Sequence, residues 1–140
     1  MLIESDLIIA YMKKEDWLKE HAEKIFRAIE ENGLVGVKAS SEVFHELYYV
    51  FSDYASLSII LGNSAKLATM KNLSFVDLTK EVYLSALGLM ETYGISSIFD
   101  AIYAATTLTD TVPDHTLLST DLVYDRIRGI KRIDPRTLQF

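Results

Sequence analysis

Cysteine is absent from this sequence of 140 residues. Its absence excludes disulfides, thiolate zinc sites and iron–sulfur clusters, so any metal ion must bind oxygen or imidazole ligands. The apolar runs at residues 7–12 and 57–61 are far shorter than the roughly 20 residues that span a bilayer. The N-terminus reaches an acidic residue at Glu4 and lacks the basic start and apolar core of a signal peptide. These absences predict a cytoplasmic protein that has no contact with a membrane.

Negative charge predominates, with 14 basic and 20 acidic residues and a net charge of −6. This balance alone argues against a partner made of phosphate. Residues 126–140, however, hold five basic side chains and one aspartate, a net charge of +4, so residues 1–125 carry −10. The tail is either a solvated surface or a phosphate-binding segment. Its basic residues are Arg126, Arg128, Lys131, Arg132 and Arg136.

Short apolar strands alternate with helices along the chain, and the hydrophobic content of 49% is enough for one domain over residues 1–140. This alternation predicts an α/β domain with a parallel sheet covered on both sides. Strands are expected at residues 1–5, 34–37, 73–76, 116–118 and 131–133. Helices are expected at residues 17–32 after Asp16, from Ser40 or Ser41 to Tyr54, at 56–70, from Thr79 to Gly94, from Ser96 or Ser97 to Leu108, and as a turn at 122–128.

Five acids are expected to meet at one edge of this sheet. Glu4 and Asp6 follow the first strand, and Asp121 follows the strand at 116–118, so parallel pairing of these strands would bring the three together. Glu46 and Asp100 lie among apolar neighbours in helices, where a lone carboxylate is poorly solvated. No lysine or arginine lies near them in sequence.

Converging carboxylates repel one another until a divalent cation screens them, and ligands that are all oxygen select Mg²⁺ or Mn²⁺. Such ions activate water and stabilise charge during phosphodiester hydrolysis. Each acid also has a simpler interpretation. Asp6 and Asp121 could cap the segments that follow them, and Asp100 could complement the positive end of its helix.

Four segments resemble the motifs of the PIN-domain ribonucleases, including VapC-type toxins. They are Ile3–Ala10 (IESDLIIA), Ala39–Leu47 (ASSEVFHEL), Ile98–Ala105 (IFDAIYAA) and Leu117–Asp125 (LLSTDLVYD). The resemblance covers nearly the whole chain, in order. It implies a three-layer α/β/α domain with a central parallel sheet, and an endoribonuclease that uses Mg²⁺ or Mn²⁺. The site residues it implies are Glu4, Asp6, Glu46, Asp100 and Asp121, with Asp125 farther out.

One departure concerns the first motif, because the family usually has aspartate at the place of Glu4 and a small neutral residue at Asp6. On a strand the two side chains would point to the same side, so either or both could bind metal. The resemblance further implies an RNA substrate, a homodimer, and an antitoxin partner if the chain is the toxin of such a pair. The basic tail would then lie beside the site and could hold RNA phosphates.

Three alternatives were weighed. A haloacid-dehalogenase phosphatase needs an aspartate nucleophile where Glu4 stands, and a receiver domain needs a phosphoacceptor aspartate and a late lysine; neither pattern is present. The third is a non-catalytic PIN-fold module that binds RNA or protein. The histidines at 21, 45 and 115 are scattered and receive no catalytic role. Residues 48–61 are predicted to be mainly buried core, with part of their surface left for a second copy or a partner.

Overall fold

The central sheet has five parallel strands in the order β3-β2-β1-β4-β5 in the computed structural model, which describes residues 1–140. The strands are β1 (Leu2–Ile3), β2 (Lys38–Ser40), β3 (Ser74–Val76), β4 (Thr116–Leu118) and β5 (Lys131–Ile133). The helices are α1 (Ser5–Met12), α2 (Lys19–Glu30), α3 (Val43–Phe51), α4 (Leu57–Ala68), α5 (Lys80–Tyr93) and α6 (Ile98–Thr107), with short 3₁₀ helices η1 (Leu122–Arg126) and η2 (Pro135–Thr137).

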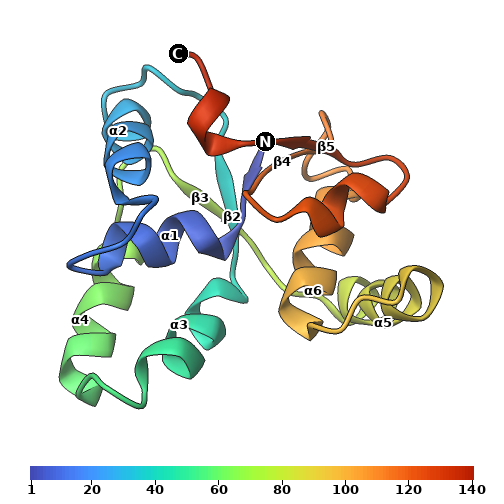
Figure 1. The fold of residues 1–140 in the computed structure, drawn as a ribbon, viewed down its shortest axis with the longest axis horizontal. Helices are drawn as coiled ribbons and strands as arrows, with labels where there is room; N and C mark the ends of the chain where they lie inside the picture. The colour runs from blue at the N-terminus through green and yellow to red at the C-terminus, as the bar shows by residue number, and fades with distance from the viewer.

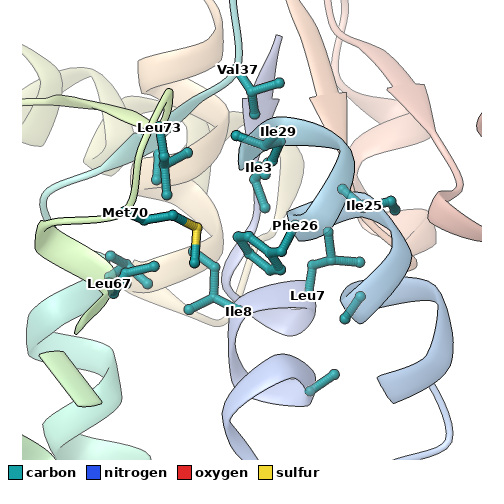
Figure 2. Close-up of a cluster of buried hydrophobic side chains, with 14 of the residues drawn as sticks. Ile3, Leu7, Ile8, Ile25, Phe26, Ile29, Val37, Leu67, Met70 and Leu73 are labelled. Carbon is teal, nitrogen blue, oxygen red and sulfur yellow. The ribbon is translucent and has the colours of Figure 1, made fainter. Parts of the chain in front are cut away.

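Helices cover both faces of the sheet, with α1 to α4 on one side and α5 and α6 on the other (Figure 1). The central strands serve both layers because successive side chains alternate between faces. Ile3 and Leu118 belong to the core under α1 to α4, whereas Leu2 and Leu117 belong to the core under α5 and α6. Figure 2 shows the first core, where Phe26 of α2 lies among aliphatic side chains of β1 and α1. The predicted three-layer α/β/α fold is confirmed.

The predicted ends of α5 and α6 are also confirmed. The Thr79 hydroxyl accepts a hydrogen bond from the Val82 amide at 3.2 Å, and Ser97 accepts one from the Asp100 amide at 3.4 Å. Gly94 ends α5 with φ of +65°, in the left-handed region that favours glycine.

Two predictions about the beginning of the chain are wrong. The first strand ends at Ile3 rather than residue 5, and Asp6 lies in the first turn of α1, so Glu4 and Asp6 do not share one side of a strand. The second strand is residues 38–40 rather than 34–37, because the backbone at Gly36 adopts φ of +71° and interrupts an extended segment there.

Two predicted helix caps differ from the structure. Leu18 occupies the N-cap of α2, and Asp16 instead accepts a hydrogen bond from the Leu18 amide at 2.9 Å. Glu42 occupies the N-cap of α3, while the Ser40 hydroxyl accepts from the Glu42 amide at 3.2 Å. Ser41 is drawn away from the helix, since its hydroxyl accepts from the amide of Leu78.

The prediction that residues 48–61 are mainly buried core is wrong for their large side chains. Phe51 and Ile60 are buried, but most of the others face outward. None of the helices is both long and apolar enough to cross a membrane. The exposed large side chains of α3 and α4 and of the turn between them are Tyr48, Tyr49, Tyr54, Leu57, Ile59 and Leu61.

Candidate active site

The candidate site lies where β1 and β4 end side by side. The chain runs outward from β1 through β2 to β3 in one direction, and from β4 to β5 in the other. Ligands of open α/β sheets bind beyond the carboxyl ends of strands at such a reversal. Ile3 pairs with Leu118, so the residues that follow them, Glu4 and Ser119, lie next to each other.

Glu4 is the most deeply buried of the five acids, with 5% of its surface exposed. Its carboxylate accepts hydrogen bonds from the hydroxyls of Ser5 at 2.8 Å and Ser119 at 3.2 Å. Burial raises the pKa of Glu4 well above its ordinary value, and the negative charges of Asp6 and Glu46 raise it further. Two serine donors therefore compensate only part of the cost of a charge at this position.

Asp6, in the first motif, is hydrogen-bonded to Thr120 in the fourth motif. Its carboxylate accepts hydrogen bonds from the Thr120 amide at 2.8 Å and from the Thr120 hydroxyl at 2.6 Å, as well as from the Leu7 amide. The simpler interpretation of Asp6 as a cap is wrong, because Glu4 occupies the N-cap of α1 and Asp6 lies within the first turn of that helix. The second oxygen of Asp6 holds the loop after β4 against α1.

Glu46 projects from α3 toward α6, where the hydroxyl of Tyr103 donates a hydrogen bond to it. Tyr103 is fully buried, and burial together with the charge of Glu46 raises the pKa of its phenol, so the phenol stays protonated and donates. The sequence analysis missed this residue. A signal was present, because Tyr103 lies three residues after Asp100 and so on the same helix face.

The pKa of Asp100 shows the combined effect of burial and of the neighbouring acids most directly. Burial raises its pKa to about 6 from 3.8, and the charges of Asp121, Glu46 and Asp6 contribute in that order. A hydrogen bond from the Ser97 side chain has the opposite effect and lowers the pKa. Carboxylates from four separate segments thus act on one another, and none of them forms an ion pair with a basic side chain, although the charge of Asp121 also acts on Arg132.

Asp121 lies at the exposed rim and accepts a hydrogen bond from the Val123 amide at 2.8 Å, which makes it the N-cap of η1. Its second oxygen carries no hydrogen bond, so capping leaves part of the carboxylate for another ligand. Asp125 points elsewhere, since it forms a two-pronged ion pair with Arg132 at 2.9 and 3.1 Å. Asp125 is therefore outside the group of mutually repelling acids.

The donor chemistry of this group fits a hard divalent cation, because all five side chains offer carboxylate oxygens and none has a cationic partner. The arrangement is open, however, and no three acidic or histidine side chains converge closely enough to hold an ion. Local hydrogen bonds explain the separation. Glu4 is held by two serines, Asp6 by Thr120 and Glu46 by Tyr103.

Tyr124 is a second residue that the sequence analysis missed. Its hydroxyl is buried and has no hydrogen-bond partner in the protein. Burial raises its pKa, followed by the charges of Glu4 and Asp100, which places the phenol beside the acids. Nothing in the sequence around η1 distinguishes this tyrosine from ordinary core.

The basic tail is largely engaged within the protein. Arg132 is bound to Asp125 and to the Ser119 carbonyl, Arg136 is paired with Asp134, and Arg126 donates to the Tyr93 carbonyl. Arg128 and Lys131 are exposed, and their side chains form no hydrogen bond or ion pair. Among the basic residues of the tail, only Arg128 and Lys131 have side chains that are free to contact phosphates.

Several solved structures share this fold. VapC20 of Mycobacterium tuberculosis, described as a toxin that cleaves the sarcin–ricin loop, has a TM-score of 0.70 and 13% identity, covering 89% of this chain and 92% of its own. VapBC2 from Rickettsia felis, solved with a DNA fragment from its promoter, has a TM-score of 0.69 and 15% identity. The match covers 94% of this chain and 96% of the VapBC2 chain. FitAcB from Neisseria gonorrhoeae has a TM-score of 0.59 and 16% identity. The match covers 98% of this chain and 99% of the FitAcB chain.

These identities are low, so the structural likeness establishes the fold alone. No curated protein sequence matches the chain significantly. The sequence itself matches the PIN domain over residues 1–130, a range that contains all four motifs and all five acids. This chain belongs to the PIN domain family.

Proposed function

We propose that this protein is an endoribonuclease that requires Mg²⁺ or Mn²⁺, with Glu4, Asp6, Glu46, Asp100 and Asp121 as its site residues. The observation that carries the proposal is the gathering of Asp100 with acids of three other segments, because burial first, and then the charges of Asp121, Glu46 and Asp6, raise its pKa to about 6. Such charge repulsion is costly for the folded protein unless a cation relieves it. A purely structural role would instead pair these acids with lysine or arginine, as Asp125 is paired with Arg132.

The five carboxylates would hold the ion, which when bound activates water as a nucleophile and stabilises negative charge on a phosphodiester. The chain contributes the positions of these groups. Tyr103 orients Glu46, Thr120 orients Asp6, and the two serines orient Glu4. No other side chain in the site is needed as the nucleophile.

The toxin of a toxin–antitoxin pair is the biological role we propose, and the protein would act in the cytoplasm. The structural neighbours support this role, since they include VapBC2 and a toxin–antitoxin complex from Klebsiella pneumoniae. A groove of about 770 Å³ between the end of α1 and helix α4 supports it as well, because its lining includes Met12, Tyr54 and Ile59. We propose that an antitoxin segment occupies this groove and that the exposed helix faces contribute to a homodimer.

The test is cleavage of a mixed-sequence single-stranded RNA by purified protein. Cleavage should require Mn²⁺ or Mg²⁺, should stop in chelator, and should fall by roughly 100-fold or more in Glu46→Gln. Asp110→Asn is the matched control, because Asp110 is exposed and makes no hydrogen bond or ion pair. Equal activity with and without metal would contradict the proposal.

The alternative is a PIN-fold module that binds RNA or a partner without cleaving it. The burial of Glu4 favours this alternative, because burial disfavours the charged form of a carboxyl group, which is the form that binds metal. Comparison of Glu4→Asp with the wild type separates the two. A large gain of nuclease activity in Glu4→Asp would mean that the natural site is degenerate.

A further inference from the structure

Three aromatic rings lie together on α3 and α6, the helices that carry Glu46 and Asp100, and have no role in the candidate site so far. The His45 ring meets the Phe99 ring edge to face, with centroids 5.5 Å apart. The centroid of the Tyr49 ring lies 5.8 Å from that of Phe99, and the two rings are tilted by 46°. His45, Tyr49 and Phe99 thus form an aromatic cluster that joins α3 to α6.

Each ring is adjacent to a proposed metal ligand. His45 directly precedes Glu46 and Phe99 directly precedes Asp100, while Tyr49 lies one helical turn after Glu46. His45 and Tyr49 are four residues apart, so they occupy neighbouring positions on one face of α3. A group that stacks on these rings is therefore held next to the helices that carry Glu46 and Asp100.

The cluster is both open to solvent and fixed in orientation. His45 is 68% exposed and Tyr49 is 69% exposed, although both contact Phe99. The Nδ1 atom of His45 is 2.8 Å from an oxygen of the largely buried Glu42, which holds the imidazole in place. Phe99 is partly buried against the core of α5 and α6. Ring surface of this kind is ready to receive a flat ligand without reorganisation.

Charge favours a nucleobase as that ligand. Residues 1–125 carry −10, and most basic side chains of the tail are already paired, so contacts with phosphates supply little affinity for RNA. Bases are uncharged and can stack on aromatic side chains whatever their identity, provided that they are not already stacked in a duplex.

We propose that His45, Tyr49 and Phe99 form a base-stacking subsite for an unpaired nucleotide that flanks the phosphate to be cleaved. This proposal rests on the proposed ribonuclease function. It predicts that the nucleotide at the stacked position is unpaired and that different bases are tolerated there.

The experiment combines changes in the protein with changes in the RNA. The cleavage position in a defined single-stranded RNA is mapped first, and each nucleotide flanking it is then replaced by an abasic one. With wild-type protein, one abasic replacement should raise KM by about tenfold, the effect of one lost stacking contact. Tyr49→Ala should raise KM similarly for the intact RNA and should be insensitive to that abasic replacement. Tyr49→Phe should behave like the wild type.

Tyr48→Ala is the matched control, because Tyr48 is exposed on the same helix and makes no ring contact with Phe99. If the effects of Tyr49→Ala and the abasic replacement simply add, the subsite is absent even though the enzyme is a ribonuclease. If the wild-type protein does not cut the RNA, both the proposed function and the subsite are contradicted. If Tyr49→Ala weakens self-association in sedimentation while KM stays constant, the cluster is a protein contact and the subsite is overturned.

Discussion

Replacing Asp100 by asparagine removes the carboxyl group whose pKa burial and three neighbouring acids raise to about 6 from 3.8. A pKa shift of this size means that the folded protein disfavours the ionised form of Asp100 by about 3 kcal/mol relative to the protonated form. Asp100 is only partly buried, so solvent screening reduces this value to roughly half. Its place in the first turn of α6 also stabilises the charged form by about 0.3–1 kcal/mol. Asp100→Asn in metal-free protein should therefore gain about 1 kcal/mol of stability at pH 8.

The pH dependence provides an internal control. The folded protein holds the proton of Asp100 more tightly than the unfolded chain does, so ionisation costs stability as pH rises from about 4 to about 6. The stabilisation of Asp100→Asn should be complete above this range and should be small near pH 4, where the Asp100 carboxyl is protonated in the folded protein.

Urea unfolding in chelator at pH 8 and pH 4 measures the effect, with Asp110→Asn as the surface control. The same variant should have lost RNA cleavage in Mn²⁺. A structural acid behaves in the opposite way, because losing a cap or ion pair costs roughly 0.5–2 kcal/mol. An Asp100→Asn protein that is destabilised at pH 8 and still cuts RNA normally would falsify the interpretation of this site.

Three further predictions concern residues around the site and the fold. Tyr103→Phe should destabilise the protein by about 1–3 kcal/mol, because it removes the donor to Glu46, and urea unfolding will show it. Substitution of both Arg128 and Lys131 by glutamine should flatten the salt dependence of RNA binding, whereas an unchanged slope would show that they do not contact phosphates. Gly94→Ala should lower stability by about 1 kcal/mol in thermal unfolding without affecting cleavage, because its φ of +65° strains any residue with a Cβ.

The parts of the fold that were predictable from sequence are those set by local chemistry. Thr79 and Ser97 cap helices because their hydroxyls reach amides three residues later, and Gly94 ends a helix because it adopts positive φ. The short strands β4 and β5 were also located correctly, since each follows a turn.

Errors arose where backbone geometry or solvent exposure outweighed the pattern. The apolar segment 34–37 resembles a strand, but positive φ at Gly36 delays pairing until Lys38. The aromatic side chains after Glu46 resemble core because apolar residues are usually buried, yet Tyr48, Tyr49 and Tyr54 are exposed. Sequence pattern does not separate a core helix from one that serves as an interaction surface.

The placement of Glu4 and Asp121 at one edge of the sheet was predictable because parallel strands bring their carboxyl ends to the same edge. The hydrogen-bond partners of the acids were not. Tyr103 is 57 residues from Glu46, and Thr120 is 114 residues from Asp6, so only the tertiary fold brings these groups together. The roles of the five acids as metal ligands remain predictions.

Calorimetric titration with Mn²⁺ tests the central claim most directly, since it detects the ion at the acids without relying on a chosen RNA. The wild type should bind Mn²⁺, and Glu46→Gln and Asp100→Asn should each weaken binding by about tenfold or more, because each removes one charged oxygen ligand. Asp110→Asn should bind as tightly as the wild type. Binding of equal strength in all four proteins, or in none of them, would contradict a metal site built from these carboxylates.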